Sequence, residues 1–99
     1  MAKYLLAYRG GGGDDSMNDE VMAAWMGWFG SMGDALKDPG NPFVASTALS
    51  PGGSRSEASG LSGYSIIEAE NLEAAAEAAK GCPLLSAGGT IEVYETMPM

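Results

Sequence analysis

The sequence predicts an α+β fold in which strands and helices follow the order β-α-β-β-α-β within one domain, residues 1–99. Residues 63–83 carry this prediction most clearly, because a β-branched and aromatic run is followed by a helix-capping residue, an alanine- and glutamate-rich run and two helix breakers. Residues 3–9 form a further strand-like run. Residues 90–95 alternate apolar and polar side chains, which is typical of a strand with one buried face.

The first strand, residues 3–9, is followed by four glycines that we expect to form a loop. A helix is then predicted from residue 18 to residue 37, because its apolar side chains recur at helical spacing and form a stripe that faces the core. The stripe consists of Met22, Trp25, Phe29, Met32 and Leu36. Glycines at positions 27, 30 and 33 each cost roughly 1 kcal/mol relative to alanine, so either packing stabilises this helix or another backbone approaches it closely.

The middle of the chain predicts a turn and a second strand. Residues 38–42 contain two prolines and a glycine that stop the helix, and residues 43–50 have the composition of a strand of moderate quality. Residues 51–53 turn the chain again. Residues 54–62 are small and polar, so we expect an exposed connection with room for one short strand.

The third strand begins at residue 63 and leads into the second helix. We expect the Asn71 side chain to accept from the free N–H groups at the helix start. Gly81 is expected to end the helix in the left-handed conformation, and Pro83 cannot continue it. A connector then leads to the last strand, residues 90–95.

This order of elements is that of ferredoxin-like domains, in which an antiparallel sheet carries both helices on one face. The first and third strands, however, place apolar side chains on both of their faces. Two helices cover only one face of such a sheet. We therefore predict a homodimer whose sheets pack face to face and enclose a cavity between or beside them.

The composition excludes several classes of partner. The formal net charge is -8 and the five Lys and Arg residues are scattered, so neither nucleic acid nor an anionic membrane surface is expected. No run approaches the roughly 20 apolar residues of a membrane span. The lone Cys82 fits a reducing compartment, and we expect a cytoplasmic protein. Because the chain has no His and no second Cys, we expect no metal site of the usual zinc or haem kinds and no cofactor.

Five segments together carry a family likeness: residues 3–6, 22–36, 63–75, 79–83 and 89–95. In their order and spacing they resemble the YCII-related family, also called the DGPF-domain family. The resemblance implies a dimeric ferredoxin-like α+β barrel and a family whose members mostly lack an assigned reaction.

The chain departs from this family at two places. The Asp-Gly-Pro-Phe tetrapeptide that names one branch is missing from residues 54–62. Another branch carries a His on the first helix and an Asp further along it, proposed as a catalytic pair. Here the region of the His reads Ala24-Trp25, and only Asp34 stands as a counterpart of the Asp. Chemistry that depends on that pair is therefore not transferred to this chain.

Asp34 is the candidate catalytic residue, because the helix dipole disfavours a carboxylate near a helix end and partial burial in a cavity would suit it to act as a general base. A solvated carboxylate is the competing interpretation. The candidate ligand-binding residues are Arg9, Tyr8, Trp25 and Tyr64. Aromatic side chains with polar tips suit ligand sites, and Tyr4 and Trp28 could line a pocket in the same way. Aromatic residues at this spacing are, however, more often part of the core or of a dimer interface.

Three further features have plainer interpretations. Residues 10–13 could hold an anion through backbone N–H groups beside Arg9, or could simply be a loop that acts as a lid. Residues 14–20 alternate oxygen-bearing side chains but lack the Gly and closing Glu of an EF-hand. Cys82 has no base or cation beside it in sequence and is expected to be inert.

The sequence thus leads to two hypotheses. In the first, a homodimer binds a small organic molecule in a cavity between the sheet and the first helix. Any catalysis there would be acid–base chemistry without metal or cofactor, using Asp34, Arg9 and a tyrosine hydroxyl. In the second, the chain is a non-enzymatic accessory or regulatory module that meets a protein partner.

Overall fold

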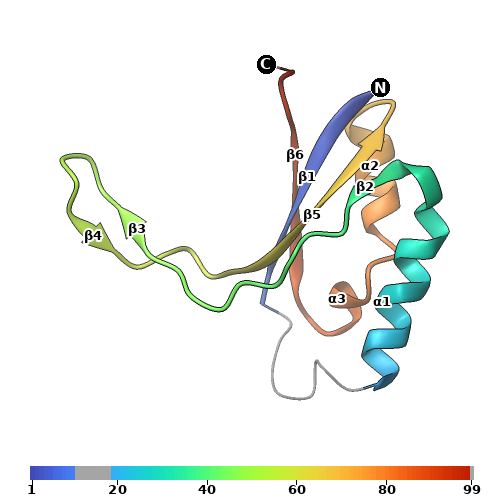
Figure 1. Cartoon of the computed structure of the whole chain (residues 1–99), viewed down its shortest axis with the longest axis horizontal. Helices are drawn as coiled ribbons and strands as arrows, with labels where there is room; N and C mark the ends of the chain where they lie inside the picture. Colours follow the sequence, from blue (N-terminus) through green and yellow to red (C-terminus); the bar gives the residue numbers. More distant parts are fainter. Residues whose placement is uncertain (11–18, 99) are drawn as a thin grey trace.

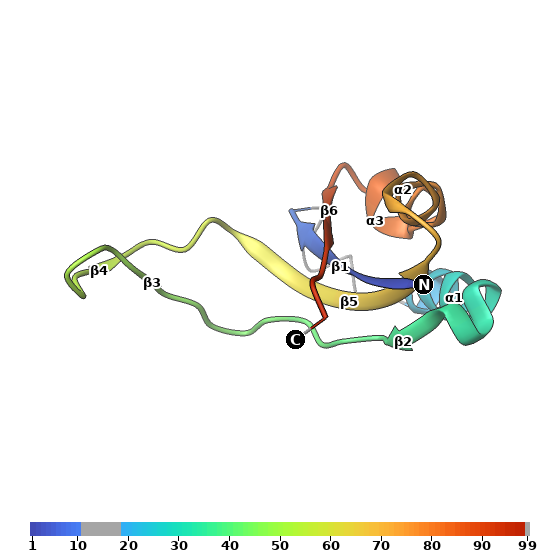
Figure 2. The same cartoon turned by 90° about the horizontal axis from the view of Figure 1, so that it is seen from above.

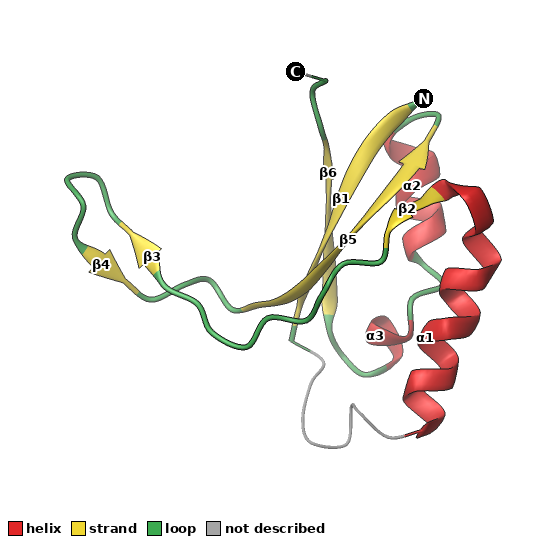
Figure 3. Ribbon diagram, viewed as in Figure 1, coloured by secondary structure: helices red, strands yellow, loops and turns green. Residues whose placement is uncertain are grey.

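The computed structural model describes residues 1–10 and 19–98 and shows a mixed α+β fold built on a four-stranded antiparallel sheet (Figures 1 and 3). The strands lie in the order β2-β5-β1-β6, with β1 (Ala2–Arg9) and β5 (Leu61–Ala69) at the centre. The edges are β2 (Leu36–Asp38) and β6 (Thr90–Glu95), so the sheet of this chain is open and does not close into a barrel.

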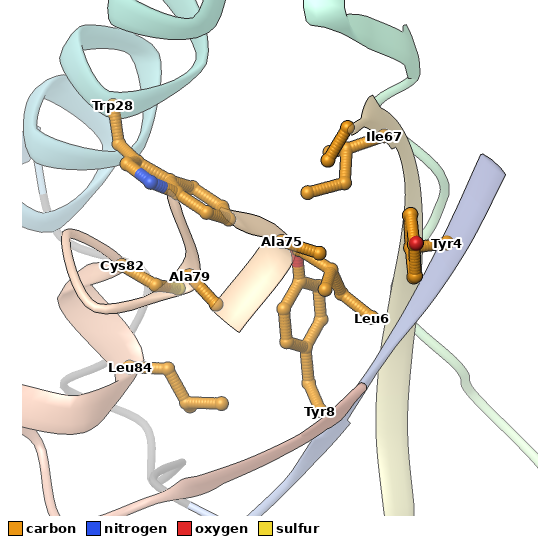
Figure 4. Close-up of a cluster of buried hydrophobic side chains, with 10 residues drawn as sticks. Tyr4, Leu6, Tyr8, Trp28, Ile67, Ala75, Ala79, Cys82 and Leu84 are labelled. Atoms are coloured by element: carbon orange, nitrogen blue, oxygen red, sulfur yellow. The ribbon is translucent and has the colours of Figure 1, made fainter. Parts of the chain in front are cut away.

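The register between β1 and β5 determines which side chains form the core. Tyr4 pairs with Ile67 and Leu6 pairs with Ser65, and paired residues share one face of a sheet. Against this face pack the helices α1 (Asp19–Met32) and α2 (Leu72–Ala79). Figure 4 shows the resulting cluster, which contains Tyr4, Leu6, Tyr8, Trp28, Ile67, Ala75, Ala79, Cys82 and Leu84.

The helices differ in how closely they pack. The helix α2 lies against β1, β5 and β6, and the short α3 (Pro83–Ser86) lies against β6 and α1. Trp28 is the one buried residue of α1, whereas Met22 and Met26 are 46% and 67% exposed. The apolar stripe of this helix is therefore only partly covered. Within the described part of the chain, no helix is long and apolar enough to cross a membrane.

The prediction of a first helix extending to residue 37 was wrong. The helix α1 ends at Met32, and Gly33 adopts a φ of 53°, a left-handed conformation that side chains other than glycine rarely tolerate. A 3₁₀ turn (Gly33–Ala35) follows, after which Leu36 begins β2 and pairs with Ile67. Helical spacing continued through this turn, so periodicity alone did not reveal the end of the helix.

The prediction of a second strand over residues 43–50 was also wrong in its main part. Of these residues, only Ala48–Leu49 form a strand, β3, which pairs with β4 (Arg55–Ser56) in a hairpin separate from the main sheet. The short strand expected in the connection at 54–62 is confirmed by β4. The β3–β4 hairpin projects away from the helices in both views (Figures 1 and 2).

The start of α2 confirms the predicted cap, because the Asn71 Oδ1 accepts from the Ala74 N–H at 2.8 Å. The role predicted for Gly81 was wrong: it is not in the left-handed region, and α2 ends at Ala79. Instead, a Cβ atom at position 81 would lie 3.1 Å from Cδ1 of Trp28, which is tighter than ordinary contact. Gly81 therefore leaves room for the indole ring. The chain then starts α3 with Pro83, a favoured first residue of a helix.

Three glycines, two within α1 and one directly after it, provide a matched test of where the helix ends. A Cβ atom at Gly27 or Gly30 would meet no atom within 4 Å, so we expect Gly27→Ala and Gly30→Ala each to stabilise the protein by up to about 1 kcal/mol. Gly33→Ala should instead cost about 1 kcal/mol or more, because of the positive φ. Urea denaturation measures all three. A loss of stability in the first two variants would contradict the placement of those glycines in open space.

Candidate functional site

A cleft of about 1040 Å³ lies between α1, the segment 39–42, the start of β5 and α3. This volume is slightly above the roughly 300–1,000 Å³ that is typical of small-molecule sites. The helix α1 contributes apolar residues to this lining, among them Met22, Trp25 and Phe29 of the stripe. The aromatic residues among those that line it are Tyr8, Trp25, Trp28, Phe29 and Tyr64.

Four of these rings contact one another, and we call Tyr8, Trp25, Trp28 and Phe29 the aromatic cluster. Trp25 is its centre, with ring centroids 5.2 Å from Tyr8, 5.7 Å from Trp28 and 5.7 Å from Phe29. The contacts to Tyr8 and Trp28 are edge-to-face, the arrangement that the ring quadrupoles favour. Because Trp25 is only half-buried, part of its ring remains available to the cleft.

Trp28 holds α1 to the rest of the chain. Its Nε1–H donates to the carbonyl oxygen of Ala78 at 3.0 Å, which satisfies the indole donor in a buried setting. Its ring enters the core cluster from α1 (Figure 4) and lies beside Gly81. A single residue thus joins one wall of the cleft to α2.

A chain of hydrogen bonds fixes the opposite wall. The Tyr8 hydroxyl donates to Ser65 Oγ at 2.6 Å, and the Ser65 hydroxyl donates to the carbonyl oxygen of Pro39 at 2.7 Å. Burial raises the pKa of Tyr8 well above its ordinary value, so its hydroxyl stays protonated and acts as a donor. Ser65 is fully buried and has both of its partners, which ties the segment 39–42 to the centre of the sheet.

The model of the YCII-related domain family matches residues 14–99 of the sequence. The chain belongs to the YCII-related family. The recognition made from the five sequence segments is thereby confirmed. A search of curated proteins found no match to this YCII-related chain.

The structure of this YCII-related protein brings together three of the predicted site residues. Tyr8, Trp25 and Tyr64 all line the cleft. Tyr64 pairs with Ala7, so it belongs to the sheet face opposite to that of Tyr8, and its ring stacks on Phe43 with centroids 5.9 Å apart. Their role in ligand binding stays a prediction.

The other two predicted residues lie apart from the cleft. Asp34 is exposed in the 3₁₀ turn after α1 and does not line it. Arg9 bonds Glu92 through Nη2 at 2.8 Å and also donates to the carbonyl oxygen of Ser59. Hydrogen bonds from Tyr94 and then from Arg9 lower the pKa of Glu92, so this ion pair persists at neutral pH. The catalytic role of Asp34 and the binding role of Arg9 stay predictions, and the structure places neither residue beside the aromatic cluster.

The sequence reasoning missed the part of the site that depends on tertiary contacts. Ser65 is a lone hydroxyl at an inward position of a strand that is otherwise apolar on that face, and this could have indicated a buried hydrogen bond. The sequence predicts a core position for Phe29 and a turn at residues 38–42, with no part in a site for either. No sequence signal showed that these residues would face α1 across a cleft.

Two predicted features fall outside the described residues. They are the loop of residues 11–13 as an anion cradle or lid and the oxygen-bearing residues 14–18. Among residues 1–10 and 19–98, no cluster of three or more His, Cys, Asp or Glu side chains is placed to hold a metal ion.

The rate at which the Cys82 thiol reacts shows whether this region is buried. Burial raises the pKa of its thiol to about 11, against about 8.5 for an unfolded cysteine. We expect the native protein to react with an aromatic disulfide reagent at pH 8 at least about 100-fold more slowly than the guanidinium-unfolded chain, since only the thiolate reacts. The raised pKa also stabilises the fold below about pH 8.5, and this contribution is lost as the pH rises towards 11. Equal native and unfolded rates would show that Cys82 is accessible.

Proposed function

We propose that this YCII-related protein binds a small organic molecule with an aromatic or otherwise apolar body in the cleft between α1 and the sheet. The observation that carries the proposal is the half-buried Trp25 ring at the centre of the aromatic cluster on the wall of that cleft. Apolar walls with a few fixed polar groups are the usual construction of small-molecule sites. The hydrogen bonds from Tyr8 through Ser65 to Pro39 support it further, because they hold one wall in place before any ligand arrives.

The proposal concerns binding and does not extend to catalysis. Of the described residues that line the cleft, none is His, Cys, Lys or Arg, and the ionisable ones are Glu20, Tyr8 and Tyr64. The proton of Tyr8 is engaged with Ser65. Asp34 lies outside the cleft, so acid–base chemistry by Asp34 and Arg9 has no geometric support.

We expect skatole, an uncharged indole, to bind to the purified protein, as measured by isothermal titration calorimetry. Trp25→Ala should weaken its binding tenfold or more, equivalent to about 1.4 kcal/mol, because the variant removes the ring at the centre of the cluster. Leu49→Ala is the matched control, an apolar truncation in the distant hairpin where the side chain is 68% exposed. Circular dichroism checks that both variants fold. Equal affinity of Trp25→Ala and the wild type would refute the site.

We further propose that the chain adopts the ferredoxin-like arrangement and pairs as a homodimer in the cytoplasm. The strand order β2-β5-β1-β6 is compatible with the former. Leu5 and Ile66 remain partly exposed on the face that the helices do not cover, which supports a second copy there. The buried free thiol of Cys82 supports a reducing compartment.

Substitution on the helix-free face tests the homodimer. Ile66→Lys places a charge at the centre of the proposed interface, so we expect native mass spectrometry to report a dimer for the wild type and a monomer for the variant. Leu72→Lys, on the exposed side of α2 at 49% exposure, should leave the dimer intact. A wild-type monomer would rule out the sheet-to-sheet dimer.

A second candidate function is that of a protein-interaction module. The β3–β4 hairpin favours it, because Val44 beside it is 100% exposed and Leu49 within it is 68% exposed. The radius of gyration, 14.5 Å, exceeds the roughly 13 Å of a compact domain of this length, as expected for a projecting arm. If neither skatole nor a charged indole binds, the interaction module is the better supported of the two functions.

A further inference from the structure

We infer that the cleft selects its ligand by charge and takes an aromatic molecule that carries a cationic amine, in preference to a neutral or an anionic one. This inference rests on the proposed binding function and adds the chemical class of the ligand. It follows from where the charged residues of the chain lie relative to the aromatic cluster.

The cationic side chains of this protein are all away from the cleft. The sequence has five Lys and Arg residues, each lies in the described part of the chain, and none of them lines the cleft. Three of the five are held in ion pairs elsewhere: Arg9 with Glu92 at 2.8 Å, Lys37 with Glu68 at 3.6 Å and Lys80 with Glu77 at 2.7 Å. A carboxylate or phosphate in the cleft would therefore meet no side chain of opposite charge.

The negative charge is distributed in the opposite way. Glu20, in the first turn of α1, is the one charged residue among the described residues that line the cleft. The whole chain carries a net charge of -8, and a cleft with apolar walls focuses such a field. Both effects attract cations and repel anions.

The aromatic cluster also favours a ligand that carries a cationic amine. The face of a tryptophan or tyrosine ring carries partial negative charge and attracts an ammonium group that lies within about 6 Å. Glu20 and Trp25 are five positions apart on α1, so they lie about 7.5 Å apart along the helix axis and about 140° apart around it. Glu20 is therefore not beside the Trp25 ring; its charge attracts the ligand's amine from the start of α1 while the ligand's ring packs on Trp25.

Three indoles that differ in charge test this inference by calorimetry on the full chain. Tryptamine is a cation at neutral pH, skatole is neutral and indoleacetate is an anion. We expect tryptamine to bind about tenfold more tightly than skatole, and indoleacetate to bind more weakly than both. Added salt should weaken the binding of tryptamine and leave that of skatole unchanged, since only the former depends on charge.

Glu20→Gln provides the residue-level test. It should weaken the binding of tryptamine several-fold, because one of the attractive charges is removed, and leave the affinity for skatole as in the wild type. Glu73→Gln is the matched control, because Glu73 is also a first-turn glutamate but lies on α2 and does not line the cleft. It should change neither affinity by more than the small effect of one distant charge.

The outcomes separate this inference from the proposed function. Tighter binding of indoleacetate than of tryptamine, with all three still sensitive to Trp25→Ala, would overturn the charge selectivity and leave the binding site standing. Equal effects of Glu20→Gln and Glu73→Gln on tryptamine would overturn the role of Glu20. Binding of none of the three indoles would overturn both the proposed site and the inference.

Discussion

The position of α1 depends on Trp28. This residue is the buried one of the helix, its indole N–H donates to the carbonyl of Ala78 in α2, and Gly81 leaves the space that the ring occupies. Trp25, Phe29 and Met32 of the same helix pack against the core only in part. Trp25 and Phe29, together with Met22 and Met26, line the cleft, where a more closely packed helix would have buried them in the core.

The other wall of the cleft is fixed by the polar interior of the sheet. Burying the hydroxyls of Tyr8 and Ser65 would be costly if either lacked a partner, and both are satisfied by the path that ends at the Pro39 carbonyl. The residues after β2 are thereby held against the centre of the sheet. Because both walls are set by interactions within the chain, a ligand would enter a site that is largely formed beforehand, which lowers the entropic cost of binding.

The sequence predicted the elements whose signals are local. The central strands, the last strand and the Asn71 cap depend on alternation and on one side chain near its own helix start, and the structure has them where expected. The sequence did not predict the local structure where that structure depends on a tertiary contact. Gly33 takes a left-handed conformation that lets Leu36 pair with Ile67, and Gly81 meets an indole from a helix that lies more than fifty residues earlier. Neither feature alters the spacing of apolar residues nearby in the sequence, so the sequence pattern does not reveal it.

The same distinction applies to the candidate site. Aromatic character led to Tyr8, Trp25 and Tyr64, and the structure places these three residues along the cleft, while their role in binding stays a prediction. The sequence predicts Asp34 near the end of a helix. In the structure the helix ends at Met32, and Asp34 lies in the exposed turn that follows. The contribution of residues 39–42 required the fold of the whole chain.

Amide hydrogen exchange, with and without saturating tryptamine, tests most directly whether α1 and the segment 39–42 enclose a ligand. We expect slower exchange in α1 and around Gly40 and Asn41 on binding, with no change in the β3–β4 hairpin. Slower exchange confined to the hairpin or to β6, with α1 unchanged, would contradict it and show that the molecule binds elsewhere.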